Sequence, residues 1–425
     1  MCSELFRIPL DWLNAPAVGS ITVSMLLALA IGIGMLKVLA WGRKTNQMAE
    51  AWGYVPGMAI IAVALLLVPR LVPAIPIRGY GVMVLLGSVT GILMAMHRAR
   101  QRNLSPDVII SMAFGLFICG IIGARLFFVI EYWDTKFKFD SWQKTIFEVL
   151  KFTEGGLVVY GSLIGGTLAF LVFTIRRGLS PLAMADLIAP SFMAGLALGR
   201  IGCLLNGCCY GGESDQPWAV TFPPESAPYM EQVVAGKMFG FSLAERDGKD
   251  SPPVISWIDE LLAEDIASGA SQYVGSKITS INGKLVNNLD DAKLVLLDAF
   301  GAGASLILKT DGGETLKLPA AEVPARSRPV HPTQVYSAVN AALLSWLLWS
   351  YYPMRRRDGE VTALMLTLYP IARFLLEIIR IDEAAVFGTG LSISQNISVV
   401  IFVGALALWF YLRRQPPHRA ELVVV

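Results

Sequence analysis

The chain alternates long apolar runs with short polar stretches. A helix needs about 20 predominantly apolar residues to cross the hydrocarbon core of a bilayer. Nine runs reach about that length, and they cover residues 19–41, 56–75, 79–97, 108–130, 156–175, 183–205, 332–352, 361–380 and 392–412. The pattern predicts an all-α polytopic membrane bundle of about nine transmembrane helices.

One long stretch, residues 212–330, is polar and contains no spanning run. Within it, the segment 278–297 (ITSINGKLVNNLDDAKLVLL) predicts a strand, a tight turn at Asn282-Gly283 and a helix. The segment 305–318 (SLILKTDGGETLKL) predicts two strands around an Asp-Gly-Gly turn. We therefore expect a small α/β domain inserted between the sixth and seventh spans.

Short basic clusters follow every odd-numbered span. They are formed by Arg43 and Lys44, by Arg98, Arg100 and Arg102, by Arg176 and Arg177, by Arg355, Arg356 and Arg357, and by Arg413 and Arg414. Cytoplasmic loops of membrane proteins are enriched in Lys and Arg. The pattern therefore predicts an N-terminus outside, a C-terminus in the cytoplasm and an extracytoplasmic insertion.

Composition supports a membrane protein. Hydrophobic residues make up 54% of the chain and charged residues only 16%, compared with about 25% charged residues in soluble domains. The formal net charge of +2 gives no reason to expect a nucleic-acid partner.

Polar groups within or beside the spans are the informative ones, because burying them in lipid is costly. The first cluster is GRIGCLLNGCCYGG at 199–212, the outer end of the sixth span. Its glycines permit irregular backbone, and Arg200 beside exposed amides suits a phosphate oxyanion. The alternative is an arginine that extends to the membrane surface from a helix end.

Two further clusters open the seventh span and close the eighth. In HPTQVY (331–336), His331 and Gln334 lie three residues apart on one helical face, although a capping histidine is the alternative. In ARFLLEIIR (372–380), Arg373 and Glu377 share a face at i, i+4 spacing. These charges predict a polar interior, and the alternative is a structural ion pair between helices.

The fourth cluster, GGLVVYGSLIGG at 155–166, places Tyr160 among small residues that permit close helix packing. A plain packing motif with an interfacial tyrosine is the alternative. A similar, shorter pattern surrounds Tyr80 at the start of the third span, in Arg78-Gly79-Tyr80-Gly81.

In this order the clusters resemble the prolipoprotein diacylglyceryl transferase family. The matching motifs are YG, GxR (123–125), GGL-x-x-Y-GG, GRIG-x-x-x-NG-x-x-x-G, HP-x-Q-x-Y, RF-x-x-E-x-x-R and LS-x-x-Q (391–395). The resemblance runs from about residue 77 to 414, interrupted by the insertion. It divides the chain into an N-terminal extension with two helices (1–76), a core in two parts (77–211 and 331–414) and a cytoplasmic tail (415–425).

The resemblance implies an enzyme of the bacterial cytoplasmic membrane. Its reaction moves the diacylglyceryl group of phosphatidylglycerol to the lipobox cysteine of a prolipoprotein, and glycerol phosphate leaves. No metal or other cofactor is implied. Arg200 and Arg373 match the family's essential arginines and would bind the phosphate. Further matching positions would shape the pocket: Tyr80, Arg125, Asn206, Gly211, Gln334, Tyr336 and Glu377.

The chain departs from the best-known members where they carry a histidine in the GGL motif, because it has Tyr160 there. A tyrosine with a reference pKa near 10 is a poor base at neutral pH. His331 is a substitute base only if it lies close enough to the reacting thiol. Tyr160 and His331 are therefore both candidate catalytic residues.

Residues 233–320 of the insertion resemble a PDZ domain. In that family, the loop matching Phe239, Gly240 and Phe241 holds a peptide C-terminus beside a strand that accepts an added strand. The resemblance implies a peptide ligand, and the insertion joins two spans whose motifs both belong to the site. We therefore expect it to recruit or orient protein substrates. The alternative is a β-rich spacer without a ligand.

Three of the five cysteines, Cys203, Cys208 and Cys209, cluster in the first motif. Their C-x4-C-C spacing is no standard zinc pattern. Small apolar packing is the favoured interpretation. A disulfide in an oxidising compartment and a catalytic thiol remain open.

Two other classes of protein are alternatives. A metal-dependent intramembrane protease needs H-E-x-x-H, and the three histidines, His97, His331 and His418, are far apart. A membrane scaffold or transporter would explain Arg373 and Glu377 but not the ordered motifs. The retained alternative is a catalytically altered paralogue that binds peptides through the PDZ-like domain.

Overall fold

The computed structural model describes residues 4–9, 16–18, 21–45, 48, 55, 58–59, 61–63, 65–67, 74–138, 141–150, 156, 158–245, 251–258, 273–303, 305–318, 324–380, 385–386 and 388–421. The chain forms two compact units, a smaller one from Cys2 to Val82 and a larger one from Met83 to Val425.

Seven described helices are long and apolar enough to cross a membrane, which confirms a polytopic membrane protein. They are α2 (Val23–Thr45), α4 (Gly79–Gln101), α5 (Pro106–Glu131), α7 (Val159–Arg176), α8 (Pro181–Asn206), α13 (Glu360–Ile379) and α14 (Ile393–Arg414). Each coincides with a predicted span.

The other two predicted spans differ from these seven. The span expected at 332–352 forms a helix, α12 (Thr333–Tyr351), but polar residues such as Gln334 and Asn340 lower its hydropathy. The span expected at 56–75 lies largely outside the described residues. The described part of the chain thus gives seven membrane-length apolar helices where the sequence predicts nine.

The smaller unit contains α2 (Val23–Thr45) and two two-stranded antiparallel sheets. One pairs β1 (Glu4–Pro9) with β4 (Ala74–Arg78), and the other pairs β2 (Pro16–Val18) with β3 (Ile21–Thr22). In the larger unit, short elements connect the long helices. They are η1 (Trp133–Phe137), α6 (Trp142–Leu150), η4 (Tyr352–Met354) and the hairpin of β11 (Ala385–Val386) with β12 (Leu391–Ser392).

Small residues bring α5 and α7 into close contact. A Cβ atom added at Gly123 would lie 2.4 Å from the carbonyl oxygen of Gly161, and one added at Gly165 would lie 2.3 Å from that of Cys119. Only glycine permits the two backbones to approach so closely. The small residues around Tyr160 therefore act in helix packing, which supports the packing interpretation of that motif.

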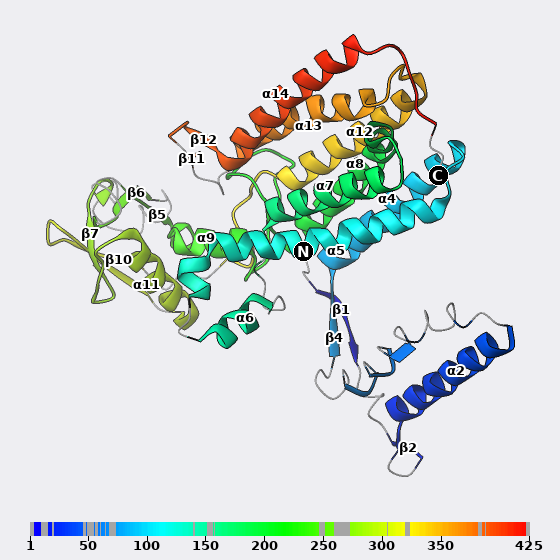
Figure 1. The fold of residues 1–425 in the computed structure, drawn as a ribbon. Helices are drawn as coiled ribbons and strands as arrows, with labels where there is room; N and C mark the ends of the chain where they lie inside the picture. The colour runs from blue at the N-terminus through cyan, green and yellow to red at the C-terminus, as the bar shows by residue number, and fades with distance from the viewer. Residues whose placement is uncertain are drawn as a thin grey trace. The chain divides into compact units, whose positions relative to one another are not determined.

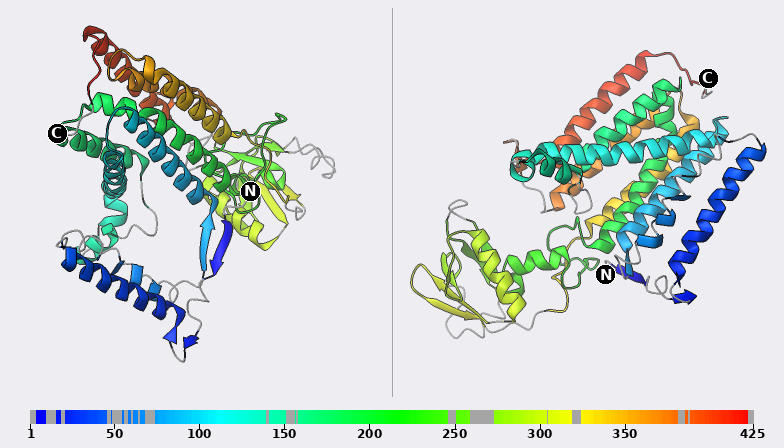
Figure 2. Two further views of the ribbon diagram at one scale, coloured as in Figure 1. Left: turned by 90° about the vertical axis from the view of Figure 1, so that its right-hand side faces the viewer. Right: turned by 60° about the horizontal axis from the view of Figure 1, so that its bottom comes forward.

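Helices α8, α12, α13 and α14 pack in succession, as Figures 1 and 2 show from three directions. Because α12 and α13 follow each other in opposite directions, the C-terminal ends of α8 and α13 meet the N-terminal ends of α12 and α14. The Gly212 amide donates to the Ile379 carbonyl at 3.0 Å, and Arg373 Nη2 donates to Ser394 Oγ at 2.8 Å. The motifs at 199–212, 331–336 and 372–380 therefore lie at the same end of these helices.

The opposite end is held by an ion pair that the sequence patterns do not reveal. Asp186 and Arg355 have side chains that are 0% and 1% exposed, and Arg355 Nε lies 3.3 Å from Asp186 Oδ2. Asp186 also accepts hydrogen bonds from the amides of Gly359 and Thr362, both at 2.8 Å. These contacts tie α8 to the turn that begins α13.

The insertion is a small α/β domain with its own core. Its elements are α9 (Ala227–Val234), η2 (Lys237–Phe239), β5 (Phe241–Ala244), β6 (Val254–Ile258), β7 (Ile278–Ile281), β8 (Lys284–Leu285), α11 (Leu289–Ala302), β9 (Leu306–Thr310) and β10 (Thr315–Leu318). One sheet has the order β10-β9-β7-β8, and β5 pairs with β6. The predicted turn is confirmed, since Asn282 and Gly283 have φ of 50° and 77° between β7 and β8.

Two backbone segments meet at the base of the insertion. Phe222 and Ser327 exchange hydrogen bonds, with the Phe222 amide donating to Ser327 Oγ and the Ser327 amide donating to the Phe222 carbonyl, both at 2.8 Å. Val220 and Val330 exchange two backbone bonds at 3.0 Å. The segment that leaves α8 and the segment that leads into α12 are therefore hydrogen-bonded to each other at the base of the domain.

The buried ion pair generates a stability prediction. Replacing Asp186 with Asn removes one of the two carboxylates that pair with buried Arg355 and leaves it only Asp358, whose Oδ1 lies 3.4 Å from Arg355 Nη2. Removing one partner of a buried ion pair costs up to about 3–5 kcal/mol. We expect Asp186→Asn to lower the apparent melting temperature of detergent-solubilised protein by several degrees. The exposed pair of Lys138 with Asp134, at 73% and 83% exposure, supplies the control, because Lys138→Met should change the free energy of unfolding by less than about 1 kcal/mol. Equal melting temperatures for both variants would contradict the assignment.

Candidate active site

The segment that follows α8 is anchored by the first turn of α12. Gln334 Nε2 donates to the Cys208 carbonyl at 2.8 Å, and Thr333 Oγ1 donates to the Cys209 carbonyl at 2.6 Å. Gly207 ends α8 in the left-handed conformation with φ of 74°. The HPTQVY motif thus satisfies the backbone of the glycine- and cysteine-containing motif, as irregular backbone near membrane depth requires.

Gly211 lies where no side chain fits. Its amide donates to the His331 carbonyl at 3.0 Å. A Cβ atom at this position would lie 2.7 Å from His331 Cβ, 2.9 Å from Thr333 Cγ2 and 3.2 Å from the Ile379 carbonyl oxygen. Gly211 therefore allows the three chain segments to meet.

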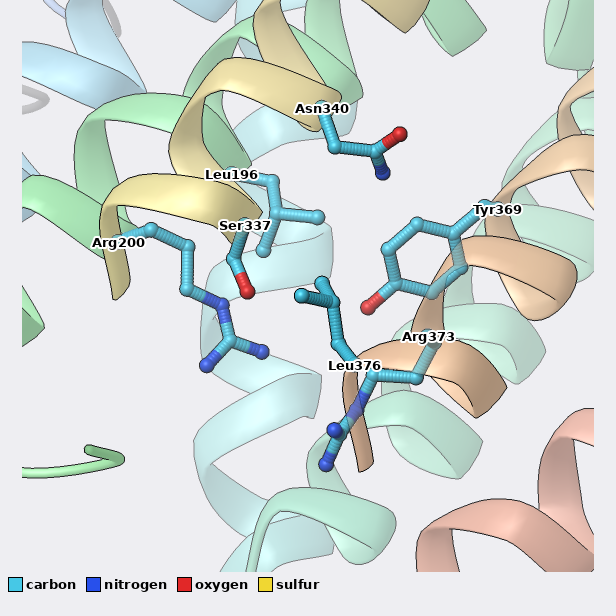
Figure 3. Close-up of a pocket in the computed structure, with 7 residues that line it drawn as sticks. All are labelled: Leu196, Arg200, Ser337, Asn340, Tyr369, Arg373 and Leu376. Atoms are coloured by element: carbon cyan, nitrogen blue, oxygen red, sulfur yellow. The ribbon is translucent and has the colours of Figure 1, made fainter. Parts of the chain in front are cut away.

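Beside this segment, α8, α12 and α13 line a small pocket that contains both arginines predicted to bind phosphate (Figure 3). Arg200 comes from α8 and Arg373 from α13, and their guanidinium groups extend toward the same region of the pocket (Figure 3). The remaining lining residues are Leu196, Ser337, Asn340, Tyr369 and Leu376. Two guanidinium groups with neutral hydroxyl and amide groups form a site suited to an anion.

The two arginines differ in their partners. Arg373 forms an ion pair with Glu377 and donates to Ser394 Oγ at 2.8 Å. Arg200 makes no hydrogen bond or ion pair with any residue in the described part of the chain. Arg200 is therefore available to a ligand without breaking an existing contact.

Glu377 is buried, with its side chain 3% exposed. Besides Arg373, it lies 3.7 Å from Arg380 Nε and accepts a hydrogen bond from Ser392 Oγ at 3.2 Å. Two positive charges compensate its burial. Glu377 is thus a structural ion-pair partner that positions Arg373, which is the alternative that the i, i+4 spacing of the two residues left open.

His331 and Tyr336 are brought together at the start of α12. His331 Nδ1 lies 3.4 Å from Tyr336 Oη, which accepts a hydrogen bond from Trp218 Nε1 at 2.7 Å. The contact orients both side chains, and it connects α12 to the segment that leads into the insertion.

The three clustered cysteines also meet. The sulfur atoms of Cys203, Cys208 and Cys209 all lie within 4.8 Å of one another, and each residue is partly buried. Hydrogen bonds from Cys203 and Cys208, with the nearby positive charges of Arg380 and Arg200, lower the pKa of the Cys209 thiol. The cluster therefore lies near Arg200, one of the two pocket arginines, and near Arg380.

Some predicted site residues have other surroundings. Arg125 donates to the carbonyls of Val149, Glu148 and Gly156 at 2.9, 2.6 and 3.2 Å, and so anchors the segment around α6. Tyr160 lies at the helix crossing of α5 and α7, next to Gly161.

Asn206 and Tyr80 are not among the residues that line the pocket. Asn206 is the last residue of α8, where its side chain hydrogen-bonds to that of Cys208. Tyr80 belongs to the smaller unit and is 44% exposed. Their roles toward lipid stay predictions.

The loop expected to bind a peptide C-terminus is engaged within the chain. The amides of Phe239 and Phe241 donate to the Gly236 carbonyl at 2.9 and 3.3 Å, and that of Gly240 donates to the Lys237 carbonyl at 3.3 Å. The Leu243 amide in β5 donates to the Ala235 carbonyl at 3.2 Å. A peptide that paired here would have to replace these bonds.

Three polar residues that line the pocket were not predicted from the sequence motifs. Tyr369 lies four residues before Arg373, and Ser337 and Asn340 follow Gln334 at three-residue steps, so helical spacing from the motif residues is the signal that could have found them. The LS-x-x-Q motif has a structural role, since Ser392 and Gln395 form a capping box at the start of α14.

These features define a polytopic membrane protein in which two arginines from different helices line one pocket. The family model described as prolipoprotein diacylglyceryl transferase matches residues 67–411. The chain therefore belongs to the prolipoprotein diacylglyceryl transferase family.

Relatives with the name phosphatidylglycerol–prolipoprotein diacylglyceryl transferase agree with this membership. The one from Rhodopirellula baltica is 30% identical over 96% of this chain and 89% of its own length. One from Corynebacterium glutamicum is 24% identical over 82% of this chain and 83% of its own length. One from Clostridium tetani is 35% identical over 40% of this chain and 67% of its own length.

The crowding at Gly211 generates a prediction for the site. Gly211→Ala should separate the post-α8 segment from α12, and we expect a loss of about tenfold or more in transfer rate because small displacements of catalytic groups are costly. Gly404→Ala in α14 is the matched control, since no described atom lies within 4 Å of its added Cβ. The check is a kinetic assay with a lipobox peptide. Retention of the full rate by Gly211→Ala would show that the close contact is not required.

Proposed function

We propose that this chain transfers the diacylglyceryl group of phosphatidylglycerol to the cysteine thiol of a prolipoprotein lipobox. A thioether forms and glycerol phosphate leaves. The observation that carries the proposal is the meeting of Arg200 and Arg373 in one pocket, in a chain of this family. The names of the relatives supply the substrate classes.

The chemistry of the step explains the need for two arginines. The lipobox sulfur attacks the glyceryl carbon that is bonded to the phosphate oxygen, the C–O bond breaks, and negative charge grows on the leaving phosphate. Guanidinium groups bind phosphate oxygens in a bidentate way and stabilise that charge. Arg200 binds it with an unpaired guanidinium, and Arg373 is held in place by Glu377.

The first turn of α12 positions the rest of the site. Gln334 and Thr333 hold the carbonyls of Cys208 and Cys209, and Gly211 allows the close approach. Asn206, Tyr336, Tyr80 and Arg125 belong to this proposal as residues that shape the pocket or its surroundings. His331 and Tyr160 are its candidates for handling the thiol proton.

The orientation in the membrane forms part of the proposal. Basic residues end α2, α4, α7 and α14. Within the larger unit, Arg200 and Arg373 lie in the C-terminal halves of α8 and α13, away from the basic turns of α7 and α14. By the positive-inside rule, the pocket faces the outer leaflet of the bacterial cytoplasmic membrane, with the C-terminus in the cytoplasm and the N-terminus outside. The insertion then lies outside, where prolipoproteins emerge.

A second candidate function is peptide binding by the PDZ-like insertion, either to recruit prolipoproteins or as a scaffold. Support comes from the order of strands and helix around the Asn282-Gly283 turn and from the attachment of the domain at the site. The engaged amides of Phe239, Gly240 and Phe241 weigh against a preformed peptide site. Recruitment by the domain therefore stands second to transfer.

Arg200 is the residue whose removal tests transfer. Without its guanidinium, the phosphate loses a transition-state partner, and we expect kcat/KM of Arg200→Ala to fall by about 10²–10³ in phosphatidylglycerol micelles with a lipobox peptide. Arg200→Lys keeps the positive charge but loses the bidentate guanidinium, so its kcat/KM should lie between those of the wild type and Arg200→Ala. Arg414→Ala, in the last turn of α14, controls for the loss of a charge and should retain the rate. An undiminished rate in Arg200→Ala would refute the assigned role.

Excision of the insertion tests recruitment. Deleting residues 224–325 and joining the ends with a short linker preserves the contact of Phe222 with Ser327. If the domain recruits prolipoproteins, the tether it provides is lost, and kcat/KM for long preproteins should fall about tenfold or more. A short lipobox peptide serves as the control substrate and should react at the original rate. Unchanged kinetics with every preprotein would exclude recruitment.

A further inference from the structure

The cysteine cluster is built by backbone geometry that the rest of the site stabilises. Cys203 occupies the last turn of α8, and the Cys208 amide donates to the Cys203 carbonyl at 3.1 Å. Cys209 has φ of 59°, a left-handed conformation that a non-glycine residue rarely adopts and that costs of the order of 1 kcal/mol. Thr333 and Gln334 bind the carbonyls of Cys209 and Cys208, so the three sulfurs are held on one side of the turn.

We propose that Cys203, Cys208 and Cys209 bind one thiophilic d¹⁰ metal ion of the Zn²⁺ class through their three sulfurs, with a fourth coordination position open. The sulfurs lie within 4.8 Å of one another. Zn–S bonds of about 2.3 Å in a tetrahedron place sulfurs about 3.8 Å apart, so the ion requires only a small contraction. Soft thiolates select such ions over hard cations.

The open position follows from the set of ligands. Among the described residues, no histidine, cysteine or carboxylate joins the three cysteines as a fourth ligand. Structural zinc sites have four protein ligands, whereas catalytic sites have three and keep a position for water or substrate. Three thiolates and a divalent ion carry a net charge of −1, which the nearby Arg200 and Arg380 stabilise.

The role of the open position rests on the proposed function, because the acceptor of that reaction is itself a thiol. A thiol that coordinates Zn²⁺ is deprotonated. Its proton goes to solvent, and the bound sulfur then forms the S–C bond as the C–O bond breaks with its electron pair left on the phosphate oxygen. The metal site would thus supply the thiolate without a dedicated general base.

The position of Arg200 fits this assignment. It precedes Cys203 by three residues on α8, so the two side chains lie on one helical face. The nucleophile and the phosphate leaving group would therefore bind next to each other. Gln334 Oε1 is buried and has no hydrogen-bond partner among the described residues, while Nε2 of the same side chain holds the Cys208 carbonyl.

Metal binding is tested on the full-length protein, reduced and stripped of metal in detergent. Titration with Co²⁺ or Cd²⁺ should produce a sulfur-to-metal charge-transfer band that saturates at one ion per chain. Competition with a chromophoric chelator then measures the affinity for Zn²⁺. Cys208→Ser should lower this affinity at least about tenfold. The double variant Cys2→Ala/Cys119→Ala, which retains only the three clustered cysteines, should match the wild type.

Absence of the charge-transfer band in reduced protein, or its persistence in the triple variant Cys203→Ser/Cys208→Ser/Cys209→Ser, would overturn the metal site. A disulfide between two of the cysteines as the native state, detected by mass spectrometry without reductant, would overturn it as well. Transfer to a lipobox peptide is the second readout. If stripped protein transfers as fast as protein reloaded with Zn²⁺, thiol activation is refuted while the transferase function stands, and if neither transfers, the proposed function itself has failed.

Discussion

The hydrogen bonds between the first turn of α12 and the segment after α8 are the interaction on which the site depends. That segment has left the helix near membrane depth, where unpaired backbone groups are costly. Thr333 and Gln334 satisfy the carbonyls of Cys209 and Cys208, and the Gly211 and Gly212 amides bond to His331 and Ile379. The end of α8, and Arg200 with it, is thereby placed against α12 and α13.

Electrostatics divides the two arginines between positioning and binding. Arg373 is compensated by Glu377, which Arg380 and Ser392 also contact, so its charge belongs to a buried network with a defined geometry. Arg200 lacks such a partner in the described part of the chain. An anion in the pocket would complete the pairing that the protein leaves open, and this differential binding of growing negative charge is what phosphate departure requires.

Helical spacing and local turn chemistry made part of this predictable from the sequence. The i, i+4 spacing of Arg373 and Glu377 predicted that they share a helical face, where they form an ion pair, and the Asn282-Gly283 dipeptide predicted the tight turn. Contacts between distant segments could not be read, because periodicity assigns a residue to an element and a face but not to a partner. Gln334 donates to the carbonyl of Cys208, which is 126 residues away in the sequence. No sequence pattern indicated the ion pair of Asp186 with Arg355 or the hydrogen bonds of Arg125 to backbone carbonyls of the α6 segment.

If the anchored segment creates the transferase site, both the transfer and its dependence on the anchoring bonds can be measured together. The measurement is the mass of a lipobox peptide after incubation with phosphatidylglycerol and either the wild type or the double variant Thr333→Val/Gln334→Leu. We expect the wild type to add a diacylglyceryl group and the folded double variant, which has lost both anchoring bonds, to add little. Equal addition by both proteins, or none by the folded wild type, would contradict this expectation.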